Sequence, residues 1–235
     1  IQAKEFVNLI EDNDSLELSE LEKYKLLNYR LENSDLRKIN HIKNNSNYWE
    51  ENFSGKGVFP PKGSGLIEED ILEERWNNLI SAIYATGEIT KRFIELQDLE
   101  GEFYFSGQNL IQIEIGSLKY KTLMKGWLNH LYLSANSSFN SKTLIISKKI
   151  DYSKKIIYEV SKEICPINTQ EATKILTEIH LLAAAGRKNC WPIPPESGLS
   201  YALAINEKNK NEEDLFQKKW EGDLYRKGET ESLTM

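Results

Sequence analysis

The spacing of apolar residues predicts helices over most of residues 1–95. Ser19 and Glu22 form an S-x-x-E capping box, a pattern that is typical of the start of a helix. The helix that follows is expected to bury one apolar face, made of Leu21, Tyr24, Leu27 and Leu31. After a loop rich in glycine and proline at residues 53–65, a second helix is predicted, with Gly87 as its stop. Its apolar side consists of Ile71, Leu72, Trp76, Leu79, Ile80, Ile83 and Tyr84.

The pattern changes near Leu96, where short apolar runs bounded by turn residues predict strands. Residues 103–105 and 110–115 are expected to form a hairpin around residues 106–109, and residues 143–147 and 156–160 a second one around residues 151–153. A helix over residues 119–135 separates the two hairpins. Another helix is predicted from Asn168, as its cap, to Gly186, as its stop. A short strand at 190–193 and helices at 197–205 and 213–220 complete the prediction of an α/β domain.

Lysines give the middle of the chain a charge opposite to that of its beginning. The net charge is −6, yet residues 1–100 carry 12 basic and 20 acidic side chains, whereas residues 101–200 carry 12 and 8. Four lysines flank the turn of the second predicted hairpin and are expected to project from its tip: Lys148, Lys149, Lys154 and Lys155. Such a tip attracts a polyanion. The alternative is a solvated turn that its charges keep soluble.

Composition limits the class of protein further. The apolar fraction of 40% and the five tryptophans predict a folded core. No apolar run approaches the ~20 residues of a membrane helix, and no secretion leader is present, so we expect a cytoplasmic protein without membrane contact. Cys165 and Cys190 are too few and too far apart for a disulfide scaffold or a zinc site. The amphipathic pattern starts at once without a methionine, which indicates a fragment of a longer protein, and no phosphate-binding loop for ATP occurs.

Three short runs carry a resemblance to a known family. They are GWLNHLYLSA at residues 126–135, CWPIPPESGLSYALA at residues 190–204 and KKWEGD at residues 218–223. In this order and spacing they resemble the end of the gamma chain of exodeoxyribonuclease V (RecC), the non-catalytic partner in the RecBCD helicase-nuclease. Upstream, EKYKLLNYRLE at residues 22–32, the loop at 53–65 and the helix around Trp76 look like the elements before that domain. The resemblance therefore extends over most of the chain.

The resemblance implies a restriction-endonuclease-like (PD-(D/E)xK-type) core, in which a mixed sheet is flanked by helices and preceded by a helical segment. It implies a domain without nuclease activity that packs on the beta chain (RecB), contacts the alpha chain (RecD) and guides or splits duplex DNA during double-strand break repair by homologous recombination. ATP and Mg²⁺ are expected on those partner subunits, and no cofactor is expected here. The predicted domains are a helical segment at 1–95, an inactive nuclease-like domain at 96–228 and a disordered tail at 229–235.

The residues allow a separate check of the missing activity. Nucleases of this fold need an Asp on one strand and an Asp/Glu-x-Lys on the next, because two carboxylates hold a divalent metal and the Lys helps to activate water. Tyr104 stands about where the Asp belongs, and Gln112 and Glu114 stand at the other two positions. No Asp-x-Lys or Glu-x-Lys occurs anywhere in the chain. We therefore expect no catalytic residue and no metal; a rearranged metal site at Glu102 or Glu114 is the alternative.

Other candidate residues have simpler explanations. His130 and His180 lie at the edges of predicted helices, where packing or a hydrogen bond accounts for them, and the two cysteines are expected to be buried. Ser197 lacks a G-x-S-x-G frame and is expected to cap a helix. Trp220 has charged neighbours and is a candidate contact for a partner subunit. Two further functions stay open: an active metal-dependent nuclease of the same fold, and a protein-interaction module without DNA contact.

Overall fold

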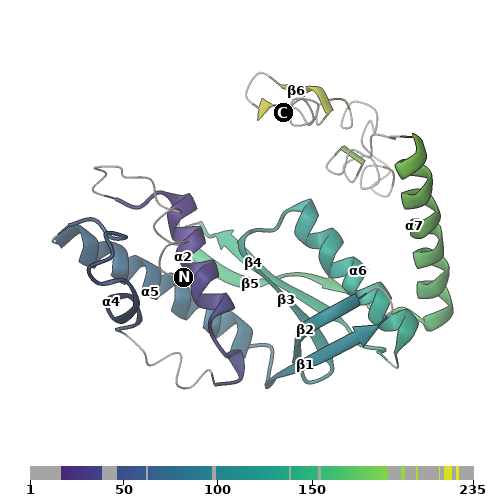
Figure 1. Ribbon diagram of the computed structural model, residues 1–235, viewed down its shortest axis with the longest axis horizontal. Helices are drawn as coiled ribbons and strands as arrows, with labels where there is room; N and C mark the ends of the chain where they lie inside the picture. The colour runs from purple at the N-terminus through teal and green to yellow at the C-terminus, as the bar shows by residue number, and fades with distance from the viewer. Residues whose placement is uncertain are drawn as a thin grey trace. The chain divides into compact units, whose positions relative to one another are not determined.

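The structure of the chain is a computed structural model. It describes residues 17–38, 47–61, 63–96, 99–137, 139–152 and 155–189, and beyond them residues 197–198, 205, 217, 220–223 and 226–227. Figure 1 labels the helices and strands. The chain divides into two compact units. The first consists of Ile1–Leu118 and Phe139–Pro166, and the second consists of Lys119–Ser138 and Ile167–Met235.

A five-stranded mixed sheet belongs to the first unit, with its strands in the order β1-β2-β3-β4-β5. Their bounds are Ile89–Leu96, Leu99–Ser106, Asn109–Ser117, Thr143–Ile150 and Ile156–Ile164. Neighbouring strands are antiparallel except β3 and β4, which are parallel. The chain runs from β3 to β4 through helix α6 (Tyr120–Asn136), because parallel neighbours need a crossover connection. Both predicted hairpins, β2–β3 and β4–β5, are confirmed.

Strand β1 corrects the expectation of helix up to residue 95. It pairs with β2 along its whole length, from Ile89 opposite Ser106 to Leu96 opposite Leu99. The run I-T-K-R-F-I-E-L sets two charged residues side by side and two apolar residues side by side, so it shows neither a strand period nor a helix period. The sheet therefore begins before residue 96. The assignment of residues 1–95, 96–228 and 229–235 to separate domains stays a prediction.

Two helices pack against the sheet of the first unit and supply much of its core. Helix α5 (Gly63–Tyr84) contacts β5, and helix α2 (Glu20–Glu32) contacts β3. The core joins apolar side chains of both helices to Ile111, Ile115 and Ile146 of the sheet. A short 3-10 helix, η1 (Leu36–Lys38), and a short helix, α4 (Tyr48–Phe53), were not predicted and contribute Leu36, Trp49 and Phe53 to this core.

The predicted apolar side of α5 is confirmed, and that of α2 is confirmed only for Leu27, which is buried, and for Leu31, which packs against the core. On α5, the fully buried residues include Leu72, Trp76, Leu79, Ile80 and Ile83. On α2, the capping box is present, but Leu21 and Tyr24 are exposed and the buried residues are Lys23, Leu26, Leu27 and Arg30. The two basic residues are buried because α5 provides a carboxylate for each. Lys23 Nζ lies 2.9 Å from Glu68 Oε2, and Arg30 Nη1 lies 2.6 Å from Glu73 Oε2.

The second unit contains α6 and helix α7 (Thr169–Asn189), which pack on each other. Leu131, Ala172 and Leu176 form a buried cluster, and Trp127 is half-buried against it. The predicted cap of α7 is confirmed, because the Glu171 N–H donates to Asn168 Oδ1 at 2.8 Å. The predicted stop at Gly186 is wrong. A glycine costs a helix only about 1 kcal/mol, and α7 continues through it to Asn189.

Farther along the second unit, two two-residue strands, β6 (Gly222–Asp223) and β7 (Arg226–Lys227), pair with each other. The predicted strand at 190–193 and the tail at 229–235 lie outside the described residues, as do most of the helices predicted at 197–205 and 213–220. Across the described parts of the chain, no helix combines the length and the apolar character that a membrane crossing requires.

Candidate functional site

The sheet register separates Tyr104 from Gln112 and Glu114, the other two positions that the sequence suggested for the metal-binding triad of a nuclease. Tyr104 on β2 lies opposite Ile111 on β3, so these two side chains point to the same face. Side chains alternate along a strand, and Gln112 therefore points to the other face. The hairpin turn consists of only Gly107 and Gln108, because Ser106 already pairs with Asn109. This two-residue turn fixes the register, and Tyr104 does not stand beside Gln112 as expected.

The carboxylates near these positions contact other groups of the same unit. Glu114 Oε1 accepts a hydrogen bond from the Gly116 N–H at 2.8 Å. Glu102 forms an ion pair with Lys91 on β1. In the ranges that the structure describes, no three His, Cys, Asp or Glu side chains are grouped so that they could hold a metal ion.

The β4–β5 hairpin places the predicted basic residues differently from the expectation. Pairing continues past residue 147 to Ile150 opposite Ile156, so Lys148 and Lys149 lie in β4 and not in the turn. The turn is closed by two hydrogen bonds: the Asp151 N–H donates to the Lys155 carbonyl at 3.0 Å, and the Lys155 N–H donates to Asp151 Oδ1 at 2.9 Å. Because consecutive strand residues point to opposite faces, Lys148 and Lys149 do not project together from the tip.

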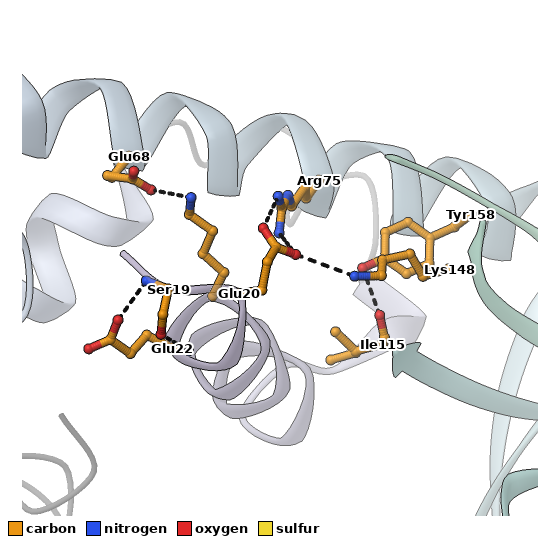
Figure 2. Close-up of polar contacts among 9 residues, drawn as sticks. Ser19, Glu20, Glu22, Glu68, Arg75, Ile115, Lys148 and Tyr158 are labelled. Carbon is orange, nitrogen blue, oxygen red and sulfur yellow. Dashed lines mark hydrogen bonds and ion pairs between the residues drawn. The ribbon is translucent and has the colours of Figure 1, made fainter. Parts of the chain in front are cut away.

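Lys148 points toward the helices of the first unit (Figure 2). Its Nζ lies 3.4 Å from Glu20 Oε2, and the same carboxylate accepts two hydrogen bonds from Arg75 at 2.7 and 3.1 Å. These hydrogen bonds lower the pKa of Glu20. Nearby, the Tyr158 hydroxyl donates to the Ile115 carbonyl at 3.1 Å, and burial raises the pKa of Tyr158 to about 12. Lys148 is thus part of a network that joins α2, α5 and β4.

Lys149 and Lys155 are the described lysines that remain at the tip. Lys149 Nζ lies 2.6 Å from Glu159 Oε1, and this ion pair raises the pKa of Lys149. The two side chains are 58% and 42% exposed, and a pair in such a place contributes little stability, so the amine can exchange Glu159 for another anion. Lys155 is exposed at the end of the turn. Lys154 lies outside the described residues.

Two residues at the tip were missed. Tyr152 is fully exposed, and Ile150 is exposed on 61% of its surface. A tyrosine that projects between lysines offers a ring for a nucleic-acid base next to amines for its phosphates. The signal is present in the sequence, where K-K-I-D-Y-S-K-K sets an isoleucine and a tyrosine inside a lysine run. The described tip therefore combines Lys149, Tyr152 and Lys155.

The other candidates are placed as follows. Trp220 is half-buried. His180 Nε2 lies 2.7 Å from the Tyr132 hydroxyl, and His130 is buried within α6. Cys165 is exposed, against the expectation of burial. Cys190, Trp191 and most of the helix that Ser197 was expected to cap lie outside the described residues.

Residues 1–206 match the family described as the RecC C-terminal domain. The matched segment contains every helix and strand from α2 to α7, and it ends before the KKWEGD run. A search of curated proteins finds no match to the chain.

Proposed function

The chain belongs to the RecC C-terminal domain family, and from this we propose that it acts as a non-catalytic domain of exodeoxyribonuclease V that scaffolds the RecBCD complex and guides or splits duplex DNA. RecC is part of this multi-subunit helicase-nuclease. The core is of the restriction-endonuclease type in this proposal. The mixed sheet, with its crossover from β3 to β4 through α6, supports that choice.

One observation carries the non-catalytic assignment. A nuclease of this fold needs carboxylates on one face of two neighbouring strands. Here Gln112 replaces the carboxylate, Glu114 replaces the Lys, and Tyr104 faces the other side of the sheet from Gln112. A carboxylate at the Lys position is wrong in sign for stabilising the charge that develops at a phosphate.

The hairpin tip supports contact with DNA. The chain as a whole is negative, at −6, so an attractive surface for phosphates must be local. Lys149 and Lys155 supply amines and Tyr152 supplies an exposed ring. Contacts of this kind carry little sequence preference, which suits a surface that guides any DNA strand.

The partners follow from the same proposal. The beta chain (RecB) and the alpha chain (RecD) are the protein partners, and they hold the ATP and Mg²⁺ that the complex uses. Trp220 is kept as a candidate partner contact, because an aromatic ring among charged residues is a frequent anchor of interfaces. The complex is expected in the cytoplasm.

The test is a titration of the assembled complex with DNA over a salt series. Lys149→Gln with Lys155→Gln should weaken binding and lower the magnitude of the log–log salt slope by up to about 1.8, at about 0.9 for each phosphate on a duplex. Tyr152→Ala should weaken the binding of single strands about fivefold or more with the slope unchanged, because base stacking contributes about 1–3 kcal/mol. The control is Lys142→Gln, directly before the first residue of β4, where the amine is paired with Glu163 at 2.7 Å.

The outcomes separate the candidate functions. If every tip variant keeps the DNA affinity and the salt slope of the parent, the remaining candidate is a protein-interaction module without DNA contact. Metal-dependent cleavage by the chain itself would favour an active nuclease of the same fold. Weakened binding in the tip variants, with Lys142→Gln like the parent, supports the proposal.

A further inference from the structure

The hairpin of β1 and β2 leaves the sheet beyond Tyr104. Strand β2 pairs with β1 along its whole length, but it pairs with β3 only from Tyr104 to Ser106. Residues 92–96 and 99–103 therefore form a two-stranded arm whose backbone ladder, among the described strands, lies within the arm itself. A two-stranded hairpin is only marginally stable alone. Contacts made by its exposed side chains therefore affect its stability more than such contacts do on a central strand.

One face of this arm carries an exposed aromatic ring among carboxylates. Phe93 lies opposite Glu102, and Glu95 lies opposite Glu100, so alternation places all four side chains on one face. Phe93 is 62% exposed and does not belong to the core of the first unit. The three glutamates are exposed as well. Glu102 is paired with Lys91, where the arm begins.

The pair of Glu95 and Glu100 is unfavourable in the chain by itself. Like charges directly opposite each other on antiparallel strands repel, and among the described residues neither carboxylate forms an ion pair. A cation from outside would relieve this repulsion. The Phe93 ring next to the pair adds a surface on which a guanidinium can stack, and arginine combines stacking with carboxylate pairing better than lysine does.

We propose that this face of the β1–β2 arm, made of Phe93, Glu95 and Glu100, is a docking surface for a protein partner that inserts an arginine side chain over the Phe93 ring and between the two carboxylates. The inference rests on the proposed function, in which the domain assembles with other subunits. The charge of this face selects the occupant: Glu95 and Glu100, which form no ion pair among the described residues, repel a nucleic acid and attract a basic protein surface. The arm and the β4–β5 tip thus have opposite charges and different ligands.

The experiment measures assembly and folding separately. The protein is combined with the beta and alpha chains, and the affinity of assembly is measured at two salt concentrations for Phe93→Ala and for Glu95→Gln with Glu100→Gln. Both variants should weaken assembly about tenfold, and the loss in the glutamine variant should shrink at high salt. Thermal unfolding of the protein alone should be unchanged for Phe93→Ala, and the glutamine variant should melt at the same temperature or higher, because the repulsion is gone.

The matched control is Glu51→Gln with Glu74→Gln, which removes the same charge from two exposed positions on α4 and α5. It should assemble like the parent. If both arm variants assemble as tightly as the parent, the proposed docking surface is wrong, and the proposal that the β4–β5 tip contacts DNA is not affected. A melting temperature that falls together with the affinity would show a structural role instead. Self-association of the parent that the variants abolish would make a second copy the occupant, and a parent that does not assemble at all would overturn the arm and the proposed scaffold together.

Discussion

Replacing Arg30 by methionine should destabilise the first unit more than the removal of an exposed charge does. Arg30 is 1% exposed, and its guanidinium carbon lies 4.2 Å from the ring centre of Tyr48 and 4.4 Å from that of Trp76. Its Nη1 donates to Glu73 Oε2 at 2.6 Å. Burial lowers the pKa of Arg30 and Glu73 opposes the shift, yet the group stays charged at any working pH. Inside the core, this charge therefore contacts the Glu73 carboxylate and aromatic faces.

The size of the effect follows from these contacts. Breaking a buried ion pair by removing one partner costs about 3–5 kcal/mol, but the Glu73 side chain is 17% exposed and can partly regain water. The loss of ring contacts adds about 0.5–2 kcal/mol, and the methionine side chain refills part of the space of the arginine stem. We expect a net loss of about 2–4 kcal/mol in the free energy of unfolding.

Urea unfolding of the purified protein, followed by tryptophan fluorescence, checks this prediction. The control is Arg37→Met, which removes an ion pair between Arg37 and Asp35 at 2.7 Å. Because the Arg37 side chain is exposed, the urea midpoint of this variant should stay near that of the parent. The double variant Arg30→Met with Glu73→Met should recover part of the loss, because no charge is then left without its partner. A parental midpoint for Arg30→Met, or equal shifts for Arg30→Met and Arg37→Met, would refute the reasoning.

Two further predictions concern catalysis and acid stability. The chain should not cleave linear DNA with Mg²⁺ or Mn²⁺, because the triad positions hold Tyr104, Gln112 and Glu114; cleavage that disappears on Glu114→Ala contradicts this. Arg75 lowers the pKa of Glu20 below its usual 4.5, so the Glu20 contribution is complete above pH 4.5 and is lost as the pH falls through the lower folded value. Glu20→Gln should therefore be less stable than the parent at pH 7, by under about 1 kcal/mol for so exposed a group. The stability difference between Glu20→Gln and the parent should vanish in acid. If thermal melts show a constant difference down to pH 3, the network is wrong.

The elements that were predicted correctly are those with a local signal. Leu72, Trp76, Leu79, Ile80 and Ile83 fall on one helical face, and packing of α5 on the sheet keeps that face. The inner face of α2 was predicted only in part, because half of it is charged. Lys23 and Arg30 are buried because Glu68 and Glu73 reach them from α5. Such a pairing is set by tertiary contact, and no apolar period reports it.

The hairpin that carries the candidate site was predictable, but the directions of its lysines were not. The turn residues at 151–153 marked the place. The strands, however, continue to Ile150 and Ile156, and this extension puts Lys148 and Lys149 on opposite faces. The carboxylate that holds Lys148 belongs to Glu20, 128 positions earlier in the chain. A contact over that distance depends on the complete fold and leaves no mark in the local sequence.

The carboxylates around the tip determine how strongly DNA binding by the hairpin can depend on salt. A phosphate that binds Lys149 must replace Glu159, and Lys148 is already held by Glu20 on the inner face of the sheet. The four lysines of the sequence therefore do not all provide a phosphate contact. Among the described residues of the tip, Lys149 and Lys155 supply the amines that can release counterions, which limits the tip's share of the slope to about two times 0.9. If Lys148→Gln alone lowered the slope as much as the tip variants do, the network with Glu20 would have to open when DNA binds.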